Sequence, residues 1–438
     1  MAKSEPILTA DEATFAPKAD LAALRGKVLI FALFGLGGAA VGLFLDQQAF
    51  LRAWLQGWLW SLNICVGMLA LCMLNHQSGG LWGIVMRRTF EVAGKSLWLF
   101  LILSTPLVIS VLGPVIGMEL LPVAFPWADP EIVAHDKLIQ KKVAYLNSWF
   151  WFARLLIYFA VWLGFAHFLA SWSKKWDETG DPRWEQRLKV LAAAGLVCYV
   201  ITVTFASVDW IMSIDPHWFS AIFGVAWVGG SGLGALSLTV ALMVFMRTRK
   251  PMDRVLNKRL FHDYGKLMLA FTMLWTYFMI GQYIIIWSGN LPEEVGWFID
   301  RGTNGWQLLS VALILGHFAL PFVVLLSADL KKKPTKFIWV AVWVLAMRWL
   351  DYYWQVAPSF SRDWSVVAEG ASHHPAESIG ANVVTWLPVD ILTALGIGAL
   401  WLWFMLGQLQ GRPLLPLHEP RVAQQVDAVA HEEAYAHG

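Results

Sequence analysis

The chain carries little charge for its length. Only 15% of its 438 residues are Asp, Glu, Lys or Arg, whereas a soluble protein carries about 25%. A soluble chain of this size would need far more charge at its surface, so the composition excludes a soluble globular protein. The formal net charge of +2 is too small for a nucleic-acid-binding face, and 58% hydrophobic residues exclude disorder.

Cysteine is also scarce. The three cysteines, Cys65, Cys72 and Cys198, lie within apolar runs and form no CxxC or CxxCH motif. Such motifs ligate iron–sulfur clusters and c-type haem, so the sequence predicts neither group in this chain. We interpret the three thiols as small buried hydrophobic groups and expect no metal ligands. Walker, GxSxG and HExxH motifs are missing as well, so we predict no catalytic residues.

Long apolar runs dominate what is present, and the mean hydropathy is +0.55. A helix needs about 20 mostly apolar residues to cross a bilayer. Ten stretches qualify, at approximately 27–45, 50–74, 95–117, 143–171, 188–210, 217–246, 261–288, 303–328, 335–357 and 383–410. The runs are continuous rather than alternating, which favours helices over a membrane β-barrel. We therefore predict an all-α membrane domain at 27–410, with polar tails at 1–26 and 411–438.

Basic residues are distributed unequally between the predicted loops. The two tails and the loops after spans 2, 4, 6 and 8 hold 24 Lys and Arg, and the opposite loops hold six. Loops rich in Lys and Arg remain on the cytoplasmic side of a membrane. The sequence therefore predicts a multi-pass protein with both termini cytoplasmic.

Three Asp-Pro pairs are predicted to begin helices, since Asp caps a helix N-terminus and Pro suits the first helical position. They are Asp129-Pro130, Asp181-Pro182 and Asp215-Pro216. We expect the first pair to start an outer amphipathic helix over 131–142, and the third pair to start the sixth span.

Ionisable residues inside the spans are costly to bury and are therefore candidates for function. In order of predicted depth they are Asp263 and Lys266 at the cytoplasmic edge, His317 in mid-membrane, and Arg348, Asp351, Asp390 and Asp209 in the outer half. We interpret them as two proton half-channels with His317 as the gate, because a continuous path would leak protons and the pKa of His can cross the working range. The alternative is that each residue makes a separate contact. Asp263 with Lys266 and Arg348 with Asp351 are three residues apart, a spacing that favours ion pairs on one helix face, and the others would contact neighbouring helices.

A second hypothesis concerns Asp209, His217 and Arg154. His217 follows Asp209 across a short connection and could share a proton with it, and Arg154 lies in the outer half of its span, where it could balance an acid. These three residues are the candidates for a quinol site near the outer face.

Two segments resemble a known family. The first runs from His262-Asp263-Tyr264-Gly265-Lys266 to Trp287-Ser288-Gly289-Asn290-Leu291-Pro292-Glu293-Glu294, and the second is Ser207-Val208-Asp209-Trp210-Ile211-Met212-Ser213 followed by Pro216-His217-Trp218-Phe219-Ser220. Both are similar to the smaller NrfD-like membrane subunits (the ActF family) of bacterial alternative complex III, a quinol:cytochrome c oxidoreductase. The resemblance covers essentially all ten spans.

The resemblance implies ten helices in the bacterial inner membrane, with spans 2–5 and 6–9 as two four-helix bundles and two peripheral helices. It implies that this chain binds no cofactor and is structural, with a proton pathway. The implied partners are the larger NrfD-like subunit, an iron–sulfur subunit, multihaem and monohaem cytochrome c subunits, membrane lipid and, as a further candidate, a haem–copper oxidase. Menaquinol or ubiquinol, haem c and iron–sulfur clusters are expected in those partners.

Two alternatives to a helper subunit remain open from the sequence. One is a subunit that binds quinol itself. The other is a secondary transporter, a class that usually shows Gly- or Pro-broken helices at matching places in two halves of the chain. We find no convincing pair of that kind, and we predict no nucleic-acid partner.

Overall fold

The computed structural model describes residues 8–14, 17–118, 120–362, 364 and 381–437. Within those residues the chain is 83% helical and forms no β-strand. The uninterrupted long helices are α1 (Lys18–Leu45), α2 (Gln47–Ser78), α8 (Ser148–Thr179), α9 (Pro182–Trp210), α10 (Phe223–Met246), α11 (Lys258–Gly289), α16 (Pro334–Phe360) and α18 (Ala381–Leu409).

Two further crossings are broken helices. One consists of α3 (Leu81–Lys95), α4 (Leu97–Leu103) and α5 (Thr105–Ile116), and the other of α13 (Gln307–Ala312), the π-helical η4 (Leu313–Ala319) and α14 (Leu320–Leu326). The short helices are α6 (Pro130–His135), α7 (Lys137–Lys142), α12 (Pro292–Gly302), α15 (Ala328–Lys331) and α19 (Pro420–His437).

All ten predicted stretches are helical, and the prediction of an all-α membrane protein is confirmed at that level. Nine of the described helical segments are long and apolar enough to cross a bilayer. The tenth stretch, α16, is long enough, but it carries Arg348, Asp351 and a run of Tyr and Trp that make it less apolar. The molecule is therefore a multi-pass membrane protein.

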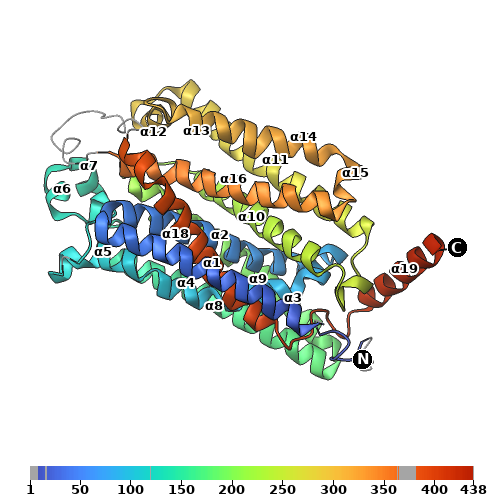
Figure 1. Cartoon of the computed structure of the whole chain (residues 1–438). Helices are drawn as coiled ribbons and strands as arrows, with labels where there is room; N and C mark the ends of the chain where they lie inside the picture. Colours follow the sequence, from blue (N-terminus) through green and yellow to red (C-terminus); the bar gives the residue numbers. More distant parts are fainter. Residues whose placement is uncertain (1–7, 15–16, 119, 363, 365–380, 438) are drawn as a thin grey trace.

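The helices lie side by side, and both chain termini are at one end of the molecule (Figure 1). We call this the terminal end, and we call the opposite end, where α6, α7 and α12 lie, the distal end. The helix α2 packs against α3 and α9, and α8 packs against α9 and α3. The helix α10 packs against α11 and α16, and it also contacts α2 and so joins the two groups.

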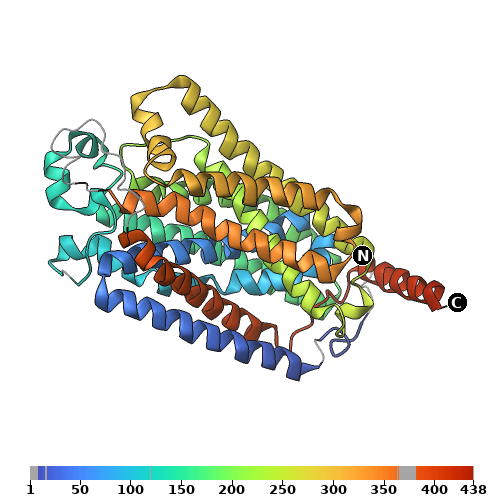
Figure 2. The same ribbon diagram turned by 45° about the horizontal axis from the view of Figure 1, so that its top comes forward.

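Glycines allow the peripheral helices α1 and α18 to pack closely along one flank (Figure 2). A Cβ atom on Gly35 would lie 2.4 Å from the backbone nitrogen of Gly396, so neither position accepts a side chain without parting the helices. The glycine-rich run at residues 229–234 of α10 packs closely as well, since a Cβ on Gly232 would lie 2.3 Å from Phe271.

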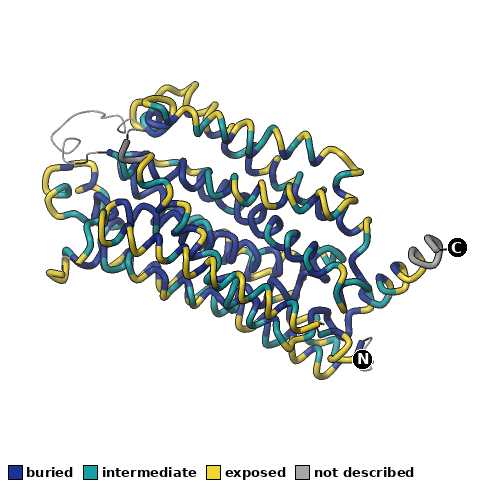
Figure 3. The backbone as a smooth tube through the Cα atoms, in the orientation of Figure 1, coloured by how far each residue is buried: buried dark blue, intermediate teal, exposed yellow. Residues whose placement is uncertain are grey.

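Burial follows the pattern of a membrane bundle. The backbone is coloured as buried, dark blue, where helices face one another and as exposed, yellow, where they face outward (Figure 3). The outward faces are apolar, as Phe31, Phe34 and Phe44 on α1 and Ile285 on α11 are each more than 60% exposed. Apolar groups on the outside of a packed bundle are stable in lipid, where water does not penalise them.

The third span begins earlier than the sequence indicates. The predicted stretch starts at residue 95, but α3 begins at Leu81 and places Arg87, Arg88 and Glu91 inside the bundle. Their charges are paired: Arg88 donates to Glu91 at 2.7 Å and also contacts Asp177. A hydropathy pattern counts each charge separately and therefore starts the span after these charged residues. In the structure the charges are paired, so the buried helix can include them.

Two of the three predicted caps are confirmed and one is wrong. The Asp129 and Asp181 carboxylates accept hydrogen bonds from the backbone of Glu131 and Arg183 at 2.9 Å. Asp215 caps nothing, because α10 begins only at Phe223. The outer amphipathic helix is also divided, since Asp136 ends α6 and caps α7.

Candidate functional site

Three of the predicted site residues lie together between α11, η4 and α16. His317 packs on Trp275, with ring centroids 3.9 Å apart. Arg348 Nη1 donates to Asp351 Oδ2 at 2.5 Å, which confirms the pair predicted from their spacing. His317, Arg348 and Asp351 are each no more than 1% exposed. We refer to Trp275, His317, Arg348 and Asp351 as the central polar cluster.

His317 lies in a π-helical segment because of the proline that follows it. Pro321 has no N–H, so it cannot donate to the carbonyl of His317 four residues earlier, and the turn widens instead. The indole of Trp343 satisfies a neighbouring carbonyl by donating to Gly316 O at 2.7 Å. The widened turn therefore holds the His317 ring inside the bundle against α11.

The Arg348 guanidinium fits into the bundle because α10 has a glycine opposite it. A Cβ at Gly230 would lie 2.4 Å from Arg348 Nη2. The guanidinium also lies 5.2 Å from the ring of Tyr352. The buried pair and the adjacent histidine are thus held by three helices.

Several polar atoms of this cluster have no hydrogen-bond partner within the described part of the chain. They include both ring nitrogens of His317. Both amide atoms of Gln282, two helical turns beyond Trp275 on the same face of α11, also have no partner among the described residues. Buried polar groups in native proteins are nearly always bonded to protein or water. A cavity of about 350 Å³ lies beside the cluster, with Arg301, Ser310 and Asp351 among its lining residues. The cavity has room for water beside Asp351.

Asp263 and Lys266 lie apart from the cluster, at the terminal end of α11. Lys266 Nζ and Asp263 Oδ1 are 3.2 Å apart, as predicted from their spacing, and both side chains are exposed. Twelve residues separate Asp263 from Trp275, about 18 Å along the helix. Met268 interrupts the buried face between them, so the described side chains of α11 form no continuous polar file.

Asp209 is fully engaged in a separate site between α8 and α9. Arg154 Nε donates to Asp209 Oδ2 at 2.7 Å and its Nη2 donates to Oδ1 at 2.9 Å. The hydroxyl of Tyr158 also donates to Oδ2 at 2.7 Å. The expectation that Arg154 balances one of the acids is confirmed, and Asp209 has both oxygens occupied.

The predicted contact between Asp209 and His217 is wrong. His217 Nε2 lies 2.5 Å from Asp136 Oδ2 at the distal end instead, because residues 215–222 form an irregular loop that carries His217 over α7. Asp390 is on a different flank, where it accepts two hydrogen bonds from Arg52 at 3.1 and 2.8 Å. The seven predicted pathway residues therefore do not share one interior.

Sequence reasoning missed two distal arginines. Arg362 bridges Asp215 and Asp300, and all three side chains are buried.

Arg301 donates to the carbonyls of Trp354 and Gln355 at 3.0 and 2.6 Å. Pro358 follows Trp354 by four residues and has no N–H, so Trp354 O is free to accept from Arg301. Burial lowers the pKa of Arg301 to about 9, which leaves it protonated at neutral pH. The proline four residues after Trp354 was the available signal.

Comparison of the sequence with protein-family models and with curated proteins gave no match. The site is therefore interpreted from its own geometry, together with the resemblance that the sequence segments suggest.

Proposed function

We propose that this chain is a membrane subunit, without a redox cofactor of its own, of a quinol-oxidising electron-transfer complex of the alternative complex III type, and that it conducts protons through two half-channels that meet at His317. The observation that carries the proton role is the buried His317, whose two ring nitrogens have no partner among the described residues, beside the Arg348–Asp351 pair. A neutral imidazole with free nitrogens can accept a proton on one side and release it on the other.

The distal half-channel in this proposal runs through Asp351, Gln282 and the adjoining cavity. Asp351 lines that cavity together with Ser310 and Arg301. Water bound to these groups would link His317 to the distal surface, since unpartnered polar atoms in a roomy cavity retain water. Arg154 donates to both carboxylate oxygens of Asp209, whereas Arg348 donates to Oδ2 of Asp351.

The terminal half-channel runs along α11 from Asp263 and Lys266. The hydroxyl of Tyr264 is buried and unpartnered on this route, and Thr272 and Thr276 lie closer to the cluster. Met268 closes the route in the resting structure, which prevents a passive proton leak. We assign Asp209 and Asp390 to helix packing rather than to the path, because Arg154 and Arg52 occupy their oxygens.

Membership of a larger complex rests on the resemblance of residues 207–220 and 262–294 to ActF-type subunits. The packing of α2, α3, α8 and α9 in one group and α10, α11, α14 and α16 in another agrees with the two bundles expected of that family. The proposal places the chain in a bacterial inner membrane beside a larger NrfD-like subunit, with haem c, iron–sulfur clusters and quinol held by partner subunits.

Purification from native membranes in a mild detergent tests membership of the complex. We expect the chain to co-purify with several proteins, at least one of which stains for covalent haem on a denaturing gel. Haem-bearing partners in fixed stoichiometry would also leave a secondary transporter without support. A chain that purifies alone, with neither haem nor iron in the preparation, would contradict the proposed complex.

Orientation is tested separately by cysteine labelling. Ser288 is exposed near the distal end of α11, and we expect Ser288→Cys in a Cys198→Ser background to react with an impermeant maleimide in intact cells. The reason is that the basic residues gather at the terminal end, which places the distal end outside. Labelling seen only in inverted vesicles would reverse the orientation.

A quinol-binding role is the second candidate, at a different place from the one the sequence suggested. The cavity of about 350 Å³ beside Asp351 has aromatic walls formed by Trp275 and Trp354 and a polar group in Arg301. An apolar slot with a few oriented polar groups suits a flat ring with two oxygens. Photo-crosslinking of a quinol analogue to α11 or α16 would favour this candidate over proton transfer alone.

A further inference from the structure

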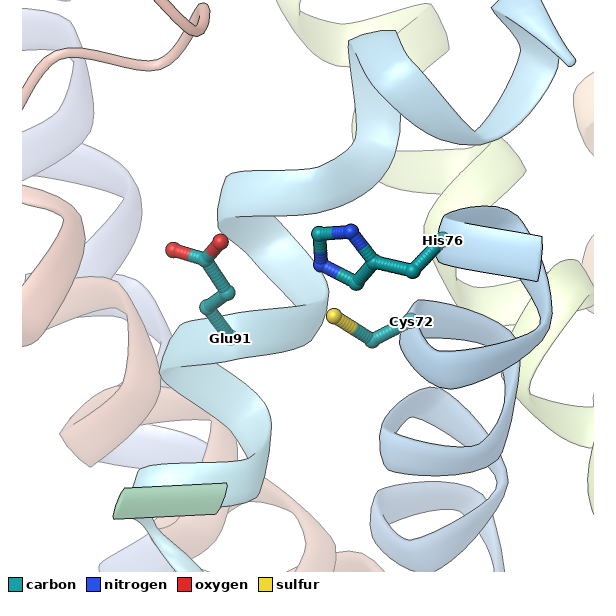
Figure 4. A group of neighbouring side chains, drawn as sticks. All are labelled: Cys72, His76 and Glu91. Carbon is teal, nitrogen blue, oxygen red and sulfur yellow. The ribbon is translucent and has the colours of Figure 1, made fainter. Parts of the chain in front are cut away.

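Three side chains with metal-ligating atoms meet near the terminal end, away from the central polar cluster. Cys72 and His76 are four residues apart on α2 and so lie on one face of that helix, and Glu91 faces them from α3. Their ligand atoms all lie within 4.8 Å of one another. Figure 4 shows Cys72 and His76 next to each other on α2, with Glu91 on the neighbouring helix α3.

These three side chains include buried polar atoms that receive no hydrogen bond from the described part of the chain. Cys72, His76 and Glu91 are 1%, 4% and 7% exposed. His76 Nε2 and Glu91 Oε1 are buried without a hydrogen-bond partner. Two unpartnered ligand atoms beside a thiol are costly in an apolar interior, and a cation shared between them would remove that cost.

The surrounding charges allow a divalent cation despite two nearby arginines. Arg87 lies 3.6 Å from Glu419, and Arg88 contacts Asp177. Asp177 and Glu419 lie against these two guanidinium groups, and Glu419 also pairs with Arg421 at 2.8 Å. The Glu91 carboxylate and a Cys72 thiolate would supply two negative charges to a cation of +2. Arg88 Nη1 also donates to Glu91 Oε2 at 2.7 Å, so it would hold the carboxylate with Oε1 directed to the metal.

We propose that Cys72, His76 and Glu91 form a binding site for a cation of the Zn²⁺ class. Sulfur, imidazole and carboxylate are the ligands that Zn²⁺ takes, and three protein ligands leave a fourth position for water. The metal would fasten α2 to α3 at the terminal end. The cysteine pattern led us to expect no metal ligand, because the site has no CxxC motif and one of its ligands comes from a second helix.

Cobalt titration of the full-length chain tests the proposal. The purified protein is stripped with a chelator in detergent and titrated with Co²⁺ alone. We expect one equivalent to bind with a sulfur-to-cobalt charge-transfer band that Zn²⁺ then removes. Cys72→Ser should lose the band. Cys65→Ser is the matched control and should keep it, because Cys65 is a buried cysteine two turns away whose thiol donates to Ala93 O at 3.1 Å.

A third variant separates ligation from folding. Glu91→Gln keeps the sulfur ligand and the shape of the side chain, and it should weaken Co²⁺ binding by at least about tenfold, the loss that even an outer-shell partner can cause. Absence of the band in the unaltered protein would overturn the proposal without reference to any variant. A band that survives Cys72→Ser, or one lost in Cys65→Ser, would also overturn it.

Discussion

Asp209→Asn is expected to lower the free energy of unfolding by about 3–5 kcal/mol. The substitution leaves Arg154 charged, 6% exposed and without its carboxylate partner. An uncompensated charge in a low-dielectric interior is what makes breaking a buried pair so costly. Unfolding of the purified chain in detergent, followed by tryptophan fluorescence, measures the effect.

A matched variant exists at the N-terminus of α2. Asp46 caps that helix through a bond from Ala49 N at 3.0 Å, and Asn caps as well as Asp, so Asp46→Asn should change stability little. The combined variant Arg154→Met, Asp209→Leu removes both charges and should recover most of the loss. Equal stability of Asp209→Asn and the unaltered chain would mean that water reaches the pair.

Arg362→Ala is expected to cause a loss of similar size, about 3–5 kcal/mol. Arg362 lies between Asp215 and Asp300, so its removal leaves two buried carboxylates without this cation. The loop at residues 211–222 should then become sensitive to limited proteolysis, because Arg362 ties it to α12. Thermal unfolding and the cleavage rate of that loop are the two measurements.

Arg183→Ala provides the control for this second prediction. Arg183 is an exposed arginine in the first turn of α9, and surface substitutions of this kind usually change stability by less than about 0.5 kcal/mol. If Arg362→Ala unfolds and is cleaved like Arg183→Ala, the bridge contributes nothing and the distal loop is held by its apolar contacts instead.

Local patterns in the sequence were enough to locate the helices. Apolar runs identified all ten helical stretches, and neighbouring residues identified the caps at Asp129 and Asp181 and the pair of Arg348 with Asp351. The caps and the pair each depend on residues within four positions of one another. The failures at Asp215 and at the start of α3 involve distant partners, Arg362 for Asp215 and Asp177 for Arg88, which no local pattern contains.

Choosing partners for the buried charges required the fold. Asp390 pairs with Arg52, which is 338 residues away, and His217 pairs with Asp136 rather than with the nearer Asp209. Depth along a helix does not say which way a side chain faces, so only His317, Arg348 and Asp351 of the seven pathway candidates lie together, and the other four make separate contacts. Pro321, four residues after His317, was the one local sign of the π-helical turn.

The proton-to-electron ratio of the assembled complex tests the central claim most directly. Quinol-driven electron transfer and proton uptake are measured together for His317→Ala and Asp351→Asn, with His167→Ala as the control because His167 is an exposed histidine on α8. We expect both cluster variants to lower the number of protons taken up per electron, while His167→Ala leaves it unchanged. Assembled His317→Ala and Asp351→Asn complexes with unaltered rates and an unaltered ratio would contradict a proton path through this chain.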